Sequence, residues 1–157
     1  MLRLTRLTDY GILLMTHMPR PGGALVSSQE LAEATRVPAT TVSKLLQSLL
    51  AAGLLESVRG AHGGYRLARA PEEISVCDII DCFEGHLALT ECNLEDGQCD
   101  QSPVCSTIGS WKKINRAVRE ALASISLADM TRADFTPVFQ LQSAPAPSIL
   151  EVRHEHA

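Results

Sequence analysis

The hydrophobic positions of the first seventy residues follow helical spacing, interrupted by short glycine- and proline-rich segments. Apolar residues three and four apart predict a first helix over residues 4–18, and the segment 19–23 ends it. The stretch SSQELAEATRVPATTVSKLLQSLLAAG then predicts a short helix, a turn around Val37 and a longer helix. This is the helix-turn-helix pattern, whose second helix enters the major groove of DNA.

Capping chemistry supports these boundaries. Ser27 and Glu30 have the spacing of a capping box, in which each side chain accepts a hydrogen bond from the other residue's backbone. Pro38 suits the first turn of the longer helix, and Gly53 suits the position just past its end. Apolar residues at i, i+3, i+4, i+7 and i+8 predict one buried stripe: Val42, Leu45, Leu46, Leu49 and Leu50.

The opposite face of the longer helix carries short polar side chains, one cation and one amide. Such groups contact base edges and phosphates in protein–DNA complexes. They are Thr40, Thr41, Ser43, Lys44 and Gln47. Taken alone, this face is equally consistent with an ordinary solvated surface.

A glycine-rich segment after the longer helix favours the DNA interpretation. Residues 54–58 and 65–68 have the composition of two short strands, joined by the turn RGAHGG. A hairpin directly after a recognition helix makes a winged helix, and an arginine on the wing can enter a narrow minor groove. The wing residues suited to DNA are Arg59, His62 and Arg66. The glycines could serve turn geometry alone, but the combined order favours DNA binding.

The second half of the chain begins at Pro71. Ser75 precedes a predicted short helix over residues 76–83, which Gly85 closes. Cys77 and Cys82 lie five residues apart on this helix and point in different directions, so they are interpreted as ordinary thiols.

A long helix is predicted over residues 107–128, and its apolar residues recur in steps of three, four or seven. The stripe consists of Ile108, Trp111, Val118, Leu122 and Ile125, with Asn115 completing the seam. No second long helix is predicted, so we expect a homodimer through this stripe, which suits a two-fold DNA site. Packing of the stripe on the first helix is the alternative. Residues from Asp129 onward are expected to lose order.

Between the two helices of the second half lies a polar loop that holds three of the five cysteines. Cys92, Cys99 and Cys105 have the spacing C-x6-C-x5-C. Clustered thiolates select zinc, copper(I) or iron–sulfur clusters. The loop lacks the close cysteine pairs of zinc fingers, but spacing alone does not choose between zinc and iron. Three unrelated thiols are the remaining interpretation.

Composition limits the classes of protein. The 157 residues are 45% hydrophobic and 20% charged, and no apolar run is long enough to span a membrane. No signal peptide is recognisable, so a cytoplasmic location with reduced thiols is expected. The sequence has no P-loop, nucleophile elbow, metalloprotease motif or dinucleotide fingerprint, so we expect neither an enzyme nor a small-molecule substrate.

Charge is unevenly distributed along the chain, although the net charge is only −4. Residues 1–70 carry eight Lys/Arg and four acids, a net +4, whereas residues 71–157 carry six Lys/Arg and fourteen acids, a net −8. A basic N-terminal half suits phosphate binding.

Four stretches resemble the winged-helix family of bacterial iron–sulfur-sensing regulators that includes IscR and NsrR. They are LTRLTDYGILL, SVRGAHGGYRLA, LTEC with the two cysteines after it, and WKKINRAV, and they span about residues 1–130. The sequence looks most like the branch that regulates SUF-system iron–sulfur assembly. The resemblance implies a homodimeric transcription factor that holds a [2Fe–2S] or [4Fe–4S] cluster through Cys92, Cys99 and Cys105.

Members of that family differ in the fourth cluster ligand. IscR-like members have a histidine three residues after the third cysteine, where this chain has Ile108, which cannot ligate. NsrR-like members use an aspartate of the partner's first helix, and Asp9 matches that position. Asp9 is therefore the first candidate, and its alternative role is a capping or surface carboxylate. The other candidates for the fourth ligand are a non-protein group and three further side chains: Glu91, His86 and Cys82.

These inferences combine into one expected architecture. The protein is expected to be mainly α with a small β-hairpin wing: a winged helix-turn-helix domain over 1–70, a short helix and cysteine-rich loop over 71–106, a dimerisation helix over 107–130 and a flexible tail over 131–157. We expect it to repress iron–sulfur assembly genes by binding double-stranded DNA and sensing cluster status. A metal-free thiol switch and a zinc-stabilised interaction module are the alternatives.

Overall fold

The computed structural model describes residues 3–60, 62–94 and 99–137. The described part is mainly helical, with one two-stranded hairpin, which confirms the predicted fold class. In chain order its elements are α1 (Arg6–Thr16), α2 (Ser28–Thr35), α3 (Ala39–Ala51), β1 (Leu55–Val58), β2 (Gly64–Leu67), the 3₁₀ turn η1 (Pro71–Glu73), α4 (Val76–Glu84), the 3₁₀ turn η2 (Glu91–Asn93), α5 (Ile108–Ala123) and α6 (Leu127–Met130).

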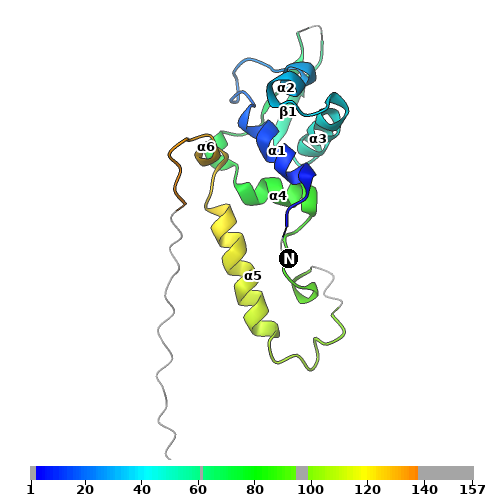
Figure 1. Ribbon diagram of the computed structural model, residues 1–157, viewed down its shortest axis with the longest axis vertical. Coiled ribbons are helices and arrows are strands. Elements are labelled where there is room, and N and C mark those ends of the chain that lie inside the picture. Colours follow the sequence, from blue (N-terminus) through cyan, green and yellow to red (C-terminus); the bar gives the residue numbers. More distant parts are fainter. Residues whose placement is uncertain (1–2, 61, 95–98, 138–157) are drawn as a thin grey trace, which may run out of the picture.

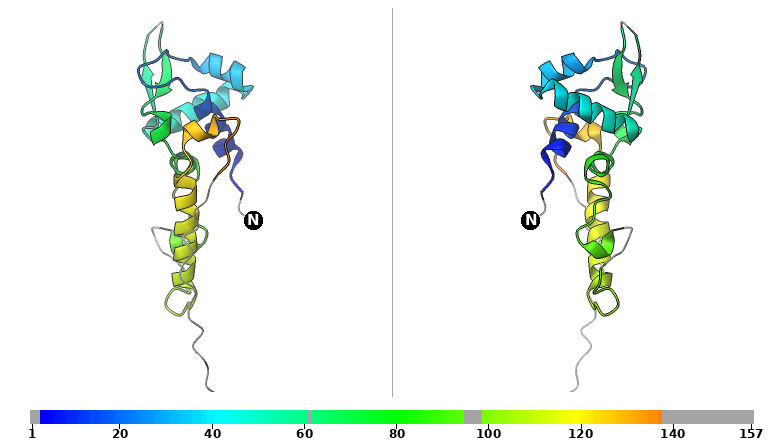
Figure 2. Two further views of the ribbon diagram at one scale, coloured as in Figure 1. Left: turned by 90° about the vertical axis from the view of Figure 1, so that its left-hand side faces the viewer. Right: turned by 90° about the vertical axis from the view of Figure 1, so that its right-hand side faces the viewer.

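The molecule is elongated, and the hairpin and the loop between α4 and α5 lie at opposite ends (Figure 1). Helices α1 to α3 and the hairpin form a compact body, with the hairpin at the top of the view. Helix α5 extends away from this body, and the segment that contains η2 runs beside it. The turned views in Figure 2 show the same rod of α5 with η2 alongside.

Local capping explains where the N-terminal helices begin and end. Helix α1 is shorter than the predicted 4–18, because Thr5 caps it by accepting a hydrogen bond from the Thr8 amide. The predicted capping box of Ser27 and Glu30 is confirmed, with both of its hydrogen bonds present. Pro38 lies at the N-cap of α3, one position before the first turn in which it was expected. Gly53 takes the left-handed conformation after α3 with a φ of 68°.

The main core joins helices α1 to α3 and the hairpin to the second half of the chain. The stripe predicted on α3 is buried at four positions, and its fifth member, Leu50, is half-buried at the edge. Ile79 of α4 and Leu127 of α6 are buried in the same cluster. Val76 and Ile80, on another side of α4, form a second cluster with Leu87, against which α5 packs. Helix α4 is therefore buried on two sides.

The predicted long helix was wrong at its C-terminal end. Helix α5 ends at Ala123, and a separate short helix, α6, begins at Leu127. The break arises because Ser126 and Asp129 form a capping box that starts a new helix. Backbone hydrogen bonds then tie the break to the chain before α4, from Val76 N to Ile125 O at 2.8 Å and from Leu127 N to Ile74 O at 2.8 Å.

The expected tail is described only in part. Asp129, where order was expected to fade, lies within α6. Residues 131–137 contain no helix or strand, and residues 138–157 lie outside the described residues. None of the helices in the described ranges combines the length and apolar character that a membrane span requires.

The contact between α1 and α4 requires a glycine and gives the first testable prediction. A Cβ atom at Gly11 would overlap the ring of Phe83. We expect Gly11→Ala to lower the free energy of unfolding by about 1–3 kcal/mol, because the ring or the helix must move. Urea unfolding measures this change. Gly109→Ala on α5 is the matched control, since nothing lies within 4 Å of its new methyl group. Equal stability of the two variants would contradict this packing.

Candidate DNA-reading face and cysteine loop

The polar face predicted on α3 is accessible. Thr40, Ser43, Lys44 and Gln47 are exposed and Thr41 is half-buried, on the side of the helix opposite the buried leucines. The Ser43 hydroxyl donates to the Ala39 carbonyl at 3.0 Å, so its oxygen remains free to accept. This helix can therefore present one cation, one amide and several hydroxyl groups to a ligand.

The hairpin holds two of its three predicted contact residues outward. Strands β1 and β2 pair antiparallel from Leu55 with Leu67 to Val58 with Gly64. Arg59 and His62 are exposed at the turn, and Ala61 lies outside the described residues. Arg66 instead forms an ion pair across the hairpin with Glu56, so a contact from Arg66 to DNA remains a prediction.

A polar hollow of about 380 Å³ lies between the N-terminus of α2 and the hairpin. It exists because Val26, just before α2, pairs with Tyr65 of β2 through backbone hydrogen bonds of 3.0 and 2.8 Å. The partial positive charge of a helix N-terminus and the Arg59 guanidinium both favour an anion here. The other polar residues of this hollow include Ser28, Ser57 and Tyr65. The sequence-based prediction missed them, because no local pattern reveals the long-range pairing of Val26 with Tyr65.

The three loop cysteines are free, half-buried thiols. The Cys92 sulfur lies 3.1 Å from the Thr90 hydroxyl, and the Cys105 sulfur lies 3.3 Å from the Thr107 hydroxyl. Hydrogen bonding by Thr107 lowers the pKa of Cys105 below its ordinary value. A lower pKa favours the thiolate, which is the form that binds metals and reacts with oxidants.

Among the described residues, these thiols are not arranged as a closed metal site. Within residues 3–60, 62–94 and 99–137, no group of three or more His, Cys, Asp or Glu side chains is placed to hold a metal ion. The residue types nevertheless fit an iron–sulfur cluster, because three cysteines that form no disulfide share one loop. The described loop is therefore open.

The candidates for a fourth ligand lie on different elements. Asp9 is exposed on the first turn of α1, and Glu91 and His86 are exposed near the loop. Cys82 packs against the main core, and burial raises the pKa of its thiol, which disfavours ligation.

Glu84, which the sequence-based prediction missed, fixes the turn of α1 that carries Asp9. Its carboxylate accepts hydrogen bonds from the Thr5 amide at 2.8 Å and from the hydroxyl of the fully buried Thr8. These hydrogen bonds, that of Thr8 first, lower the pKa of Glu84. The C-terminus of α4 thus holds the N-terminus of α1 in place. No pattern in the sequence indicated this pairing between residues so far apart.

The stripe predicted for dimerisation divides into two parts. Val118, Leu122 and Ile125 pack within the chain against the cluster on α4, and Ile108 is half-buried. Trp111 is 39% exposed, and Ile114, which the prediction did not include, is 45% exposed. Large apolar side chains are also exposed on or just before α1: Leu4, Leu7 and Leu13.

Comparison with known proteins finds a family model and relatives that match most of this chain. A family model described as "Rrf2: Iron-dependent Transcriptional regulator" matches residues 4–133. The HTH-type transcriptional regulator NsrR of Shouchella clausii is 30% identical over 131 residues, which cover 82% of this chain and 88% of that protein.

Two solved structures share the fold. The structure of CymR, described as the global cysteine regulator of B. subtilis, has a TM-score of 0.65 and 30% identity, covering 83% of this chain and 97% of that one. The structure of T. potens IscR has a TM-score of 0.58 and 34% identity, covering 82% and 85%. Both alignments extend well beyond a helix-turn-helix unit.

The contact of Glu84 with α1 predicts a specific pH dependence. Because its pKa is lowered in the folded state, the stability that it contributes is fully present above its unfolded pKa, near 4.3, and is lost as pH falls through the lower folded value. We therefore expect Glu84→Gln to unfold more easily than wild type at neutral pH, with the difference shrinking below about pH 4. Urea unfolding from pH 3 to 7 measures this difference. Glu120→Gln, at an exposed position, is the control, and a difference independent of pH would refute the assignment.

Proposed function

This chain belongs to the Rrf2 family of DNA-binding transcriptional regulators, and from that premise we propose that it represses iron–sulfur assembly genes in the cytoplasm through a cluster held on its cysteine loop. It is a regulator and not an enzyme. The observation that carries the proposal is the set of three free cysteines on one loop, at the end of the molecule opposite the DNA-reading hairpin.

DNA would be read by the exposed face of α3 and by the hairpin. Lys44 and Arg59 supply charge for phosphates and grooves, while the hydroxyls of Thr40, Thr41 and Ser43 and the Gln47 amide suit base edges. We also assign the hollow between α2 and the hairpin to a DNA phosphate, because it combines a helix N-terminus with Arg59. His62 and Arg66 would extend the contact along the hairpin.

The cluster would be held by Cys92, Cys99 and Cys105. When bound, it supplies a redox-active centre that oxidants can damage. Gain or loss of the cluster would change how the loop holds its three thiols, and that rearrangement would be the signal. The Thr107 hydroxyl prepares Cys105 by favouring its thiolate. An oxygen ligand from Asp9 would leave one corner of the cluster bound less firmly than by thiolate.

A second copy of the chain would complete the site. Large apolar side chains are exposed on α1 and α5, including Leu7 and Trp111, and a partner chain would bury them. Asp9 is exposed on the same helix as Leu7. The start of α1 points towards the end of the molecule that carries η2 and α5 (Figure 1). A two-fold dimer through these surfaces would offer Asp9 to the partner's loop and present two α3 helices to a two-fold DNA site.

A metal-free thiol switch is the second candidate. It is supported by the open arrangement of the thiols among the described residues and by the lowered pKa of Cys105. The two candidates differ in one observable, which is iron and sulfide in protein prepared without oxygen.

The role of the hairpin can be tested with one substitution. We expect Arg59→Ala to weaken binding to promoter DNA several-fold or more and to reduce the salt dependence of log K by about one unit of slope, because one phosphate contact is lost. Fluorescence anisotropy at several salt concentrations measures both. Arg116→Ala, exposed on α5 away from the hairpin, should bind like wild type. Unchanged affinity and slope in Arg59→Ala would sink the assignment.

The cluster ligands can be tested by substitution without oxygen. Wild type prepared anaerobically or reconstituted should contain iron and sulfide and absorb visible light, whereas Cys92→Ser, Cys99→Ser and Cys105→Ser should not, because each loses a thiolate ligand. Cys77→Ala, on α4, is the matched control and should retain the colour. Asp9→Ala should load iron but lose its colour faster in air.

Three outcomes of that experiment decide among the candidates. Iron and sulfide lost in all three loop variants support the cluster. Zinc without iron or sulfide would indicate the structural zinc site instead. Colourless wild type with neither metal, after every attempt at reconstitution, would leave the thiol switch.

A further inference from the structure

The carboxylate of Asp81 holds the stem of the cysteine loop, defined here as residues 87–89, against α4 and α5. We propose that Asp81 is a positioning residue that transmits the state of the loop to the DNA-binding half of the chain. This inference rests on the proposed function, since it needs a loop with two states. It adds a named point of coupling between the two ends of the molecule.

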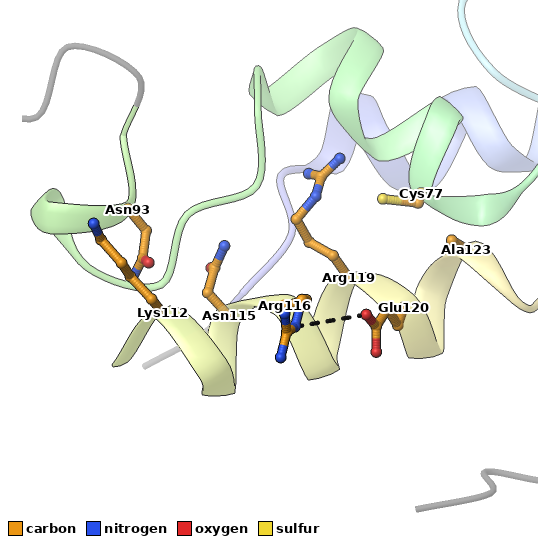
Figure 3. Close-up of a pocket in the computed structure, with 8 residues that line it drawn as sticks. All are labelled: Cys77, Asn93, Lys112, Asn115, Arg116, Arg119, Glu120 and Ala123. Carbon is orange, nitrogen blue, oxygen red and sulfur yellow. Dashed lines mark ion pairs between the residues drawn. The ribbon is translucent and has the colours of Figure 1, made fainter. Parts of the chain in front are cut away.

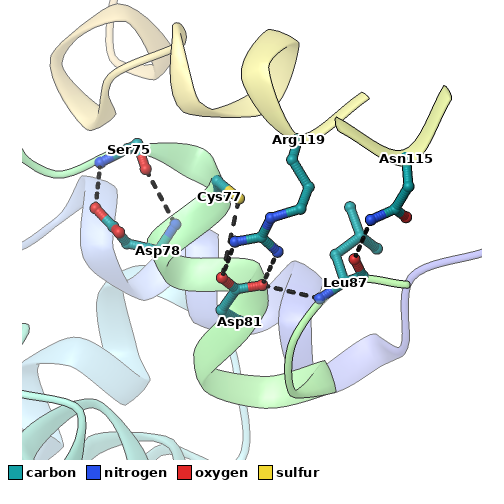
Figure 4. A network of polar contacts seen from close by, with 7 residues as sticks. All are labelled: Ser75, Cys77, Asp78, Asp81, Leu87, Asn115 and Arg119. Atoms are coloured by element: carbon teal, nitrogen blue, oxygen red, sulfur yellow. Dashed lines mark hydrogen bonds and ion pairs between the residues drawn. The ribbon is translucent and has the colours of Figure 1, made fainter. Parts of the chain in front are cut away.

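The carboxylate of Asp81 accepts four hydrogen bonds, from the Leu87 amide, twice from Arg119, and a long one of 4.0 Å from the Cys77 thiol (Figure 4). Its Oδ1 accepts from the Leu87 amide at 3.1 Å and from Arg119 Nη1 at 2.9 Å, and its Oδ2 accepts from Arg119 Nη2 at 2.7 Å. The two side chains are only 23% (Arg119) and 29% (Asp81) exposed. A bidentate guanidinium–carboxylate pair fixes both distance and orientation, so α4, α5 and the stem are held as one unit.

Asn115 of α5 fixes the same stem from the other side. Its side-chain carbonyl accepts from the Leu89 amide at 2.9 Å, and its amide group donates to the Leu87 carbonyl at 3.3 Å. Asn115 is buried, and the Leu87 side chain lies in the cluster between α4 and α5. Two side chains therefore anchor three backbone groups of the stem, and Cys92 follows only three residues after Leu89.

A hollow lies beside this arrangement, so on that side the stem is held by polar contacts, while the Leu87 side chain packs in the cluster between α4 and α5 (Figure 3). It measures about 430 Å³ and lies between α5, Cys77 of α4 and Asn93 of η2. Arg119 and Asn115 line it and extend from α5 towards the stem and α4. Because Asn93 of η2 lines the hollow, removing the polar contacts should loosen the stem and the loop that follows it.

Helix α4 continues the connection to the DNA-binding elements. Ile79, two residues before Asp81, is buried in the main core with the leucines of α3. Phe83 packs against Gly11, and Glu84 binds the first turn of α1. A displacement of the stem must therefore shift α4 or break the Asp81 contacts, which is the physical requirement for coupling.

The test compares two variants that break the ion pair, Asp81→Asn and Arg119→Gln, with the exposed control Glu120→Gln. In cluster-free protein, we expect the Leu87 and Leu89 amides to exchange with solvent about tenfold faster in both variants than in the control. This readout by NMR does not depend on the cluster. Having two variants keeps the test decisive if one of them fails to fold.

The second readout is the ratio of DNA affinities between the two states of the loop, either cluster-loaded and cluster-free or, for a thiol switch, oxidised and reduced. Wild type and Glu120→Gln should show a ratio of about tenfold. Asp81→Asn and Arg119→Gln should fall to about twofold or less while loading as much iron as wild type. Arg119→Lys, which keeps the charge but not the bidentate fork, should recover part of the ratio.

The outcomes separate this inference from the proposed function. If the ion-pair variants exchange faster yet keep the wild-type affinity ratio, Asp81 does not couple the two ends and the inference is overturned. If the wild type itself shows equal DNA affinity in both states, the proposed function is refuted, and the inference, which depends on it, is refuted as well. That failure is visible in the wild type alone.

Discussion

The burial of α4 on two sides is the constraint on which the rest of the structure depends. Neighbouring residues on a helix point about 100° apart, so Ile79 and Ile80 face different clusters. Burying each of these side chains contributes about 1.5–3 kcal/mol. Because both faces are occupied, α4 cannot move with respect to the DNA-binding core without also disturbing α5.

The distribution of charge and shape around α4 suits a protein that reads DNA at one end and a chemical signal at the other. The hairpin and α3 belong to the half of the sequence with a net charge of +4, whereas the cysteine loop belongs to the half with −8. This asymmetry favours phosphate binding in the first half of the chain. Between the two ends, Asp81 and Glu84 occupy the last turns of α4, where one meets the loop stem and the other meets α1.

Local patterns in the sequence were sufficient for most of the fold. The capping box of Ser27 and Glu30 and the leucine stripe of α3 specify their elements through contacts within a few residues, and both were confirmed. The end of α5 was predicted wrongly although Ser126 and Asp129 show the same capping spacing, because the apolar periodicity was followed through the break. Periodicity identifies an apolar face but does not say which surface will cover it.

The sites were harder to predict, because they depend on contacts between distant residues. Asn115 was expected in a dimer seam and instead binds the loop stem within the chain. The ion pair of Arg66 with Glu56 across the hairpin was not foreseen, and a contact of Arg66 with DNA stays a prediction. Asp81 and Glu84 were not singled out at all, since a single acidic residue on a short helix carries no local signal of its partner. The cysteine spacing was visible in the sequence, yet the described residues do not form a closed metal site. The final arrangement of the ligands depends on a bound group or a partner chain, and a single chain specifies neither.

The central claim is that a chemical change at the thiols reaches the DNA-reading helices through α4. Hydrogen exchange of the full-length wild type, followed across the whole chain in both states of the loop, tests this most directly. Protection should change in α4 and in the helices packed on it, α1 and α3, together with the loop. A change confined to the segment from Thr90 to Ser106, with α4 and α3 exchanging identically in both states, would contradict the claim.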